Sequence, residues 1–129
     1  MIGVDTNILV RYLTKDDERQ WQQAVEIIEG GEQCFIANIV LCELVWVLRG
    51  KPYEFGRVEI SNTMELILQC SIFELENPSV VYQALQRFKQ GKADFSDYLI
   101  GAIAQQSGCT TTATFDRKLR DYKGFNLLE

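Results

Sequence analysis

Short strand-like runs that alternate with longer helical patterns constrain the fold of this chain more than any other feature of its sequence. The runs fall at residues 2–4, 34–37, 72–75 and 109–113, with a further run at 125–128 that fits an edge strand. Between them, apolar residues recur every three or four positions, which is the spacing of one helix face. Strands joined through helices pair in parallel, with helices on both faces of the sheet. The sequence therefore predicts an α/β fold, a three-layer α/β/α sandwich around a central parallel sheet of four to five strands.

Turn and capping residues set the limits of the expected helices. Gly30 and Gly31 end the helix that follows the first acidic stretch, and Asn77 with Pro78 opens a later helix, because proline suits the first helical position. We expect the remaining helices at residues 39–48, 54–69, 94–106 and 115–122.

The size and composition of the chain indicate one globular domain over residues 1–129. A chain of 129 residues that is 47% hydrophobic can bury a substantial core. No apolar run approaches the roughly 20 residues that span a bilayer, and no signal peptide opens the chain. The 4 cysteines lie in apolar segments without a C-x-x-C pair, as is typical of reduced core thiols. We therefore expect a cytoplasmic protein with no membrane partner.

Histidine is absent from the sequence. Catalysis by Ser-His-Asp or Cys-His groups is therefore excluded, and so is any imidazole ligand to a metal. Proton transfer or metal binding in this chain must rest on carboxylates.

Asp5 stands at the point where the first apolar run gives way to a helical pattern that resumes at Ile8. In an open parallel sheet, ligands bind beyond the carboxyl ends of the strands, so this position suits chemistry. An aspartate directly before a helix can equally serve as its N-cap. The sequence around Asp5 alone leaves both interpretations open.

Glu43 is the one polar residue in the stretch 39–48. A helix that is apolar all round is buried, and a buried charge is costly unless it is paired or bound to a metal. We therefore expect Glu43 to be a buried functional acid. The alternative is that Glu43 lies on one exposed stripe of the helix.

Three further acids lie in the last third of the chain. Asp94 and Asp97 are three positions apart, so they share one face of the first turn of a helix, where Asp94 can act as the N-cap that answers Asp97. Asp116 follows the threonine-rich run 110–114, which places it at the carboxyl end of a strand. A simple turn role for Asp116 remains the alternative.

Asp5, Glu43, Asp97 and Asp116 can all point to the same edge of a parallel sheet. Two carboxylates about 5 Å apart repel by about 3 kcal/mol at an effective dielectric constant near 20, and a cation relieves that repulsion. Oxygen ligands without histidine or thiolate select hard ions such as Mg²⁺ or Mn²⁺. This arrangement predicts metal-assisted hydrolysis of phosphodiester bonds.

Four stretches carry a resemblance to a known family: VDTNILVRYL at 4–13, ANIVLCELVWVL at 37–48, KADFSDYLIGAIAQQSGC at 92–109 and TTATFDRKL at 111–119. Together, and in this order, they resemble the PIN-domain ribonucleases, specifically the VapC-type toxins of toxin–antitoxin pairs. The four stretches extend over the whole chain. Leu119 departs from the family pattern, which often has an aromatic residue there.

The resemblance implies an α/β/α sandwich and an Mg²⁺-dependent endoribonuclease that cuts RNA, with Mn²⁺ as a substitute ion. It implies catalytic and metal-binding roles for the acids Asp5, Glu43, Asp97 and Asp116. It also implies supporting polar roles for Thr6, Asn7 and Thr114, and Asp94 is a further supporting candidate. Members are usually homodimers that a cognate antitoxin silences by covering the site. Apolar residues over 53–69 exceed what one small sheet covers, so we expect this helix to form part of the dimer.

The charge of the chain is unusual for a protein that binds nucleic acid, because its net charge is −5 and its pI is about 4.8. However, 18 acidic residues face 13 basic ones, and setting aside the four site acids and Asp94 makes the two numbers equal. Bound cations would cancel part of the excess. Basic residues that can hold phosphates or simply face solvent flank the acids in sequence: Arg11, Lys15, Lys89, Lys92, Arg117, Lys118 and Arg120.

Three alternatives to a toxin nuclease remain open from the sequence. A receiver domain also gathers acids at a sheet edge, but it needs a late-strand lysine, and Thr114 and Asp116 occupy that place. A PIN-domain nuclease of RNA processing would share the same acids. A catalytically inactive PIN fold would serve only as a binding module.

Overall fold

The computed structural model describes residues 1–129, and the chain divides into two compact units, Met1–Pro78 and Ser79–Glu129. The first unit contains a parallel sheet of three strands in the order β1-β2-β3: β1 (Ile2–Gly3), β2 (Cys34–Ile36) and β3 (Phe73–Leu75). Ile2 lies opposite Cys34, and Cys34 lies opposite Phe73. The parallel pairing predicted from the alternating pattern is confirmed.

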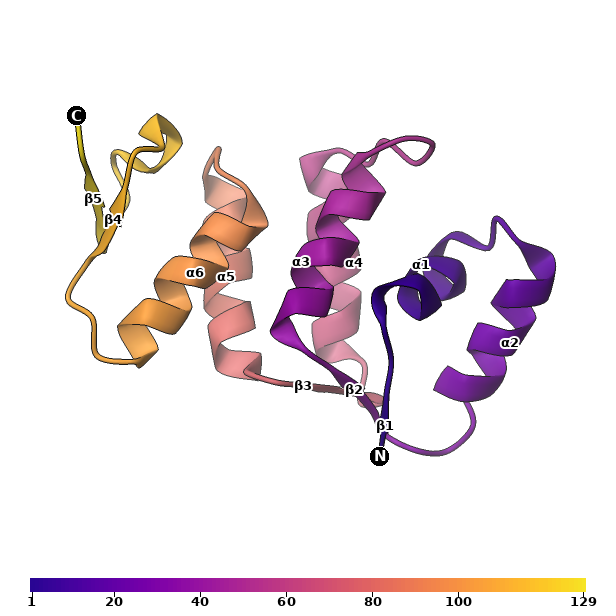
Figure 1. The fold of residues 1–129 in the computed structure, drawn as a ribbon. Helices are drawn as coiled ribbons and strands as arrows, with labels where there is room; N and C mark the ends of the chain where they lie inside the picture. Colours follow the sequence, from indigo (N-terminus) through magenta and orange to yellow (C-terminus); the bar gives the residue numbers. More distant parts are fainter. The chain divides into compact units, whose positions relative to one another are not determined.

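Four helices accompany these strands: α1 (Thr6–Thr14), α2 (Glu18–Ile28), α3 (Asn38–Arg49) and α4 (Arg57–Gln69). Helix α1 packs against both α2 and α3, and α3 contacts α4 (Figure 1). The core of this unit contains the fully buried side chains of Leu9, Ile36, Leu44, Ile60 and Met64. Because β1 leads directly into α1, and β2 into α3, the starts of both helices follow the carboxyl ends of neighbouring strands.

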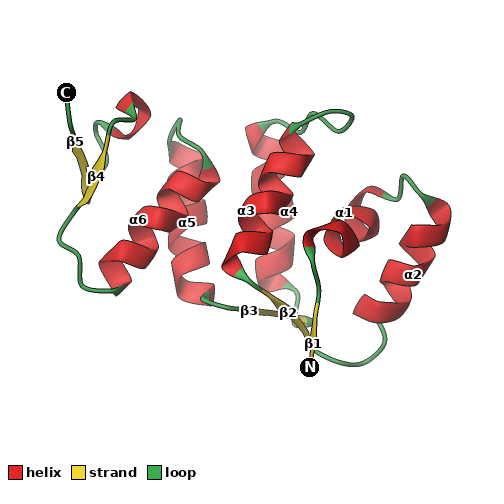
Figure 2. Ribbon diagram, viewed as in Figure 1, coloured by secondary structure: helices red, strands yellow, loops and turns green.

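The second unit contains α5 (Pro78–Gln90), α6 (Phe95–Gln106), β4 (Thr112–Thr114), a short 3-10 helix (Arg117–Leu119) and β5 (Phe125–Leu127) (Figure 2). Strands β4 and β5 form a parallel pair of their own, so the five strands form a sheet of three and a sheet of two where the sequence predicted one central sheet of four to five strands. Aromatic side chains fill the core of this unit. The rings of Phe88 and Phe95 meet edge to face at 6.2 Å, and those of Tyr98 and Tyr122 at 5.1 Å.

Several boundaries differ from those expected from the sequence. Helix α4 begins at Arg57 rather than near residue 54, because the side chain of Glu59 accepts a hydrogen bond from the amide of Gly56 and fixes the start there. Strand β4 begins at Thr112 rather than at Cys109, because the Cys109 amide still donates to the carbonyl of Ala104 at the end of α6. The helix expected at 115–122 is a single 3-10 turn.

The cysteines are only partly core residues. Cys34 and Cys42 are buried, whereas Cys70 is half-buried and Cys109 is exposed, and all four thiols are free. The expectation that all of them lie in the core is therefore wrong for Cys109. No helix is long and apolar enough to cross a membrane.

Candidate active site

Asp5 follows β1 and is the N-cap of α1. Its Oδ1 accepts a hydrogen bond from the Ile8 amide at 3.2 Å, and the residue is exposed. The cap uses one carboxylate oxygen, which leaves Oδ2 available to a ligand. The two interpretations that the sequence left open for Asp5 are therefore compatible, since a cap at the end of a strand also faces the ligand-binding edge.

Glu43 is exposed, so the expectation that it is buried is wrong. Helix α3 buries Leu41, Leu44 and Leu48 on one side, but it leaves Ile39 61% exposed and Trp46 49% exposed on the side that carries Glu43. An apolar sequence does not bury every face of a helix when only one side meets a core. Glu43 therefore has no desolvation cost to offset, and its carboxylate is accessible.

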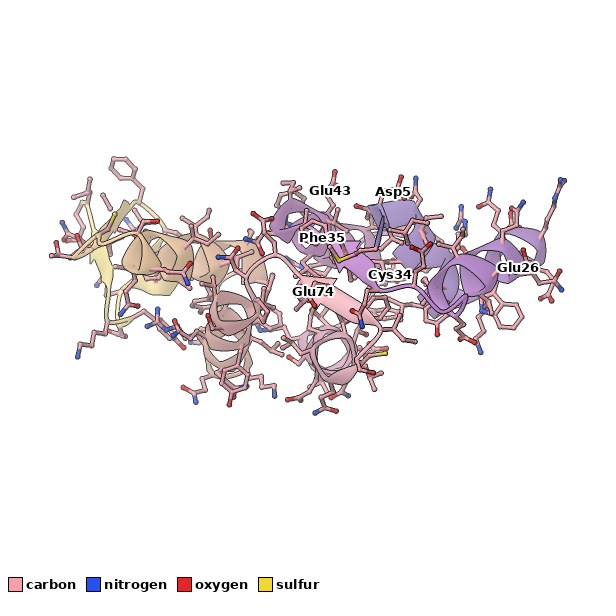
Figure 3. The ribbon with its side chains drawn as sticks, turned by 90° about the horizontal axis from the view of Figure 1, so that it is seen from below. Asp5, Glu26, Cys34, Phe35, Glu43 and Glu74 are labelled. Carbon is pink, nitrogen blue, oxygen red and sulfur yellow. The ribbon has the colours of Figure 1, made fainter.

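A hydrogen bond joins the first turn of α1 to α3. The Thr6 hydroxyl donates to Oε1 of Glu43 at 2.8 Å. This bond orients Glu43 and holds it beside Thr6, the residue that follows Asp5. Asp5 and Glu43 lie on the same edge of the unit (Figure 3). Asn7 is exposed in the same first turn. The first unit thus presents Asp5 and Glu43 as an accessible pair of acids.

A pocket of about 240 Å³ opens beside Asp5, between α1 and α2. Its wall is formed by Asp5, Asn7, Ile8, Arg11, Gln20 and Gln23. Nothing in the sequence singles out the glutamines, because polar residues along an amphipathic helix are typical of a solvent-facing side. Only the packing of α1 against α2 places them next to an acid.

In the second unit, Asp94 is the N-cap of α6 and Asp97 is the third helical residue. The Asp94 amide donates to Oδ2 of Asp97 at 3.2 Å, which is the returning bond of a capping box, as expected. Burial raises the pKa of Asp97 above its ordinary value. The negative charges of Asp116 and Asp94 act in the same direction, whereas the hydrogen bond from Asp94 and the charge of Lys118 oppose them.

Asp116 lies two residues beyond the end of β4. Its amide donates to the Thr114 hydroxyl at 3.0 Å, and its Oδ1 accepts from the Lys118 amide at 2.9 Å. The turn role that the sequence left open is therefore real. Asp116 is near enough to Asp97 for its negative charge to raise the pKa of Asp97. The second unit therefore presents a pair of acids, as the first does.

The acids thus fall into two pairs, Asp5 with Glu43 and Asp97 with Asp116. No group of three or more His, Cys, Asp or Glu side chains that could hold a metal ion is found. The chemistry of each pair fits a hard cation, because every donor is a carboxylate oxygen. Binding of one cation by all four acids stays a prediction.

A larger pocket, of about 500 Å³, opens in the second unit. It opens at the carboxyl end of α6, where Gln105, Thr110 and Thr112 form its wall together with the cations Arg87 and Lys123. None of the four acids borders it, so it is not the candidate site for hydrolysis.

Comparison with known proteins assigns this chain to a protein family. The model of the PIN domain family matches residues 2–124, and the chain belongs to this family. The resemblance drawn from the four sequence stretches and the PIN-like α/β fold are therefore confirmed, and the receiver-domain alternative is set aside.

Two known proteins are similar to this chain. The chain is 26% identical over 120 residues to a VapC ribonuclease of Aquifex aeolicus (strain VF5), covering 91% of this chain and 88% of that protein. It also matches the crystal structure of Mycobacterium tuberculosis VapC20, a Sarcin-Ricin loop cleaving toxin. That match has 17% identity and a TM-score of 0.45, and it covers 89% of this chain and 88% of the other.

Proposed function

We propose that this protein is an Mg²⁺-dependent endoribonuclease that hydrolyses RNA phosphodiester bonds and acts as the toxin of a toxin–antitoxin pair. The observation that carries the proposal is the repeated placement of acids at strand ends. Asp5 follows β1 and Asp116 follows β4, and each is accompanied by a helix acid, Glu43 or Asp97. The relative of Aquifex aeolicus is named a ribonuclease, which supports the same activity.

The residues that would hold the cation are Asp5, Glu43, Asp97 and Asp116. When bound, Mg²⁺ or Mn²⁺ supplies charge neutralisation at the phosphate and activation of water. Membership of the PIN family supports the RNA substrate, since the chain shares its family with a protein named a VapC ribonuclease.

The side chains around the acids hold them in position. Thr6 donates to one oxygen of Glu43, which leaves the other oxygen to face a ligand. Thr114 fixes the backbone of Asp116, and the Asp94 amide holds one oxygen of Asp97. Fixed carboxylates lose little conformational freedom when a cation binds, so this arrangement favours tight and specific coordination.

The proposal includes the partners of a cytoplasmic toxin: an RNA substrate, a cognate antitoxin that covers the site, and a second copy of the chain. Helix α4 supports the homodimer, because Val58 is 73% exposed and Leu66 is 65% exposed on it. Large exposed apolar side chains on one helix are typical of an interaction surface.

A cleavage assay on total RNA tests the activity. We expect the purified protein to cut RNA internally with Mg²⁺, to stop when a chelator is added, and to resume with Mn²⁺. Asp5→Asn removes a charge while keeping an N-cap, so it should fold normally and lose cleavage. Cleavage that persists in the chelator, or in Asp5→Asn, would contradict the proposal.

A further inference from the structure

The pocket beside Asp5 contains polar groups that the proposed hydrolysis does not use. Its volume of about 240 Å³ is below the roughly 300 Å³ at which pockets for whole small-molecule ligands begin. It therefore suits one small group rather than a whole ligand. Because Asp5 forms part of its wall, any group bound there lies next to the proposed site of cleavage.

Hydrogen bonds fix the orientation of Gln20 within this pocket. The guanidinium Nε of Arg11 donates to Oε1 of Gln20 at 2.5 Å. Since Nε–H can only donate, this bond identifies the amide oxygen and leaves the Gln20 NH₂ group as the donor that faces a ligand.

The charge of Arg11 is neutralised by an acid, and hydrogen bonds hold its side chain in place. Its Nη1 lies 3.0 Å from Oδ1 of Asp16 and donates to the Tyr53 hydroxyl at 3.2 Å. The carboxylate of Asp5 also forms part of the pocket wall. A phosphate group would meet an already paired cation and a repelling acid, so the pocket favours a neutral ligand.

Gln23 completes the polar wall one helical turn beyond Gln20. It is exposed, and its amide carries both donors and an acceptor. Ile8 adds an apolar surface on which a flat ring can pack. Asparagine and glutamine amides are groups that proteins use to bind base edges, and single-stranded RNA is recognised by bases that leave the stack.

We infer that Gln20 and Gln23 of α2 bind the edge of one nucleobase next to the scissile phosphodiester, and so set the base preference of cleavage. The inference rests on the proposed ribonuclease function and adds specificity-determining residues to it. The NH₂ group of Gln20 selects a base with an acceptor at that position, and Gln23 supplies a second contact.

Cleavage-site mapping on a pool of single-stranded RNA with random sequence tests the inference. The wild-type protein should prefer one base at one position beside the cut. Gln23→Ala should reduce that preference by about tenfold or more, as expected for loss of a base contact, while it continues to cut RNA. Gln20→Glu keeps an acceptor for Arg11 and removes the donor, so it should weaken the same preference.

Gln22→Ala is the matched control. Gln22 lies on the same helix, but its amide bonds to Glu18 at 3.2 Å and does not line the pocket. It should keep the wild-type preference. An unchanged preference in Gln23→Ala and Gln20→Glu, with cleavage intact, would overturn the inference and leave the proposed function standing. A complete loss of cleavage in folded Gln23→Ala would also overturn it, and an inactive wild-type protein would overturn both proposals.

Discussion

Asp97 combines a structural bond with unfavourable surroundings for its charge. It accepts the returning bond of the capping box, and yet burial and its acidic neighbours raise its pKa. A raised pKa in the folded state means that the folded protein binds the proton more tightly than the unfolded chain does. The contribution of Asp97 to stability is therefore fully present below its ordinary pKa and is lost as the pH rises through the raised value.

The Asp97→Asn variant separates the two roles. Asparagine removes the charge and keeps an oxygen that can accept the Asp94 amide. At neutral pH we expect the metal-free variant to melt at the same temperature as wild type or up to a few degrees higher. We expect RNA cleavage to fall by about 100-fold or more.

A purely structural role for Asp97 predicts the opposite pair of results. Cleavage would stay intact, and the melting temperature would drop by the amount that a weakened cap costs, about 1 kcal/mol of stability. Melting curves without metal and the cleavage assay distinguish the two roles, and a stable, fully active variant would show that the active site lies elsewhere.

At the scale of elements, the sequence predicted strands better than it predicted exposure. The limits of β1, β2 and β3 agree with the apolar runs to within a residue, because polar or turn residues bound each run. The exposed side of α3 could not be predicted, since nine apolar residues in ten leave no periodicity from which to locate its solvent face. The positions of the candidate acids Asp5, Asp97 and Asp116 could be predicted because strand ends and helix starts are visible in sequence, and their roles stay a prediction. The glutamine pocket depends on how α1 packs against α2.

The contact between α1 and α2 makes a contribution to stability that depends on pH in the alkaline range. The Tyr12 hydroxyl donates to Oε2 of Glu29, the C-cap of α2, at 2.6 Å, and this bond raises the pKa of Tyr12 to about 12. Because the folded pKa is raised, the stability that Tyr12 contributes is present below its ordinary pKa of 10.0 and is lost as the pH rises towards 12. Glu29→Gln should bring the pKa of Tyr12 down towards 10.0, and ultraviolet titration of tyrosinate measures it.

Tyr12→Phe is the companion variant. It should remove the step near pH 12 from the tyrosinate titration. A wild-type titration in which every tyrosine ionises near its ordinary pKa would contradict the account of the α1–α2 contact.

At the scale of the whole molecule, the distribution of charge bears on the proposed action of this acidic chain on RNA. The net charge is −5, but acids and bases balance once the proposed metal ligands and Asp94 are set aside. Bound cations would therefore bring the chain closer to neutrality. The single domain over residues 1–129 stays a prediction, although the PIN family model extends over residues 2–124.

Assembly provides a prediction at this scale. Light scattering at micromolar concentration should give twice the mass of the chain, and replacement of both Val58 and Leu66 by Ser should give a monomer, because the two side chains are the large exposed apolar residues of α4. Ile27→Ser on α2, where the side chain is 41% exposed, is the control and should remain a dimer. A monomeric wild-type protein would contradict the proposed homodimer.

The central claim is that carboxylates of this chain bind a divalent cation, and calorimetric titration of the RNA-free protein tests it most directly. We expect Mg²⁺ and Mn²⁺ to bind the wild-type protein, and we expect this binding to weaken strongly in Asp5→Asn and in Asp97→Asn while both variants remain folded. Cation binding that is absent from the wild-type protein, or that is unchanged in the two variants, would contradict the account.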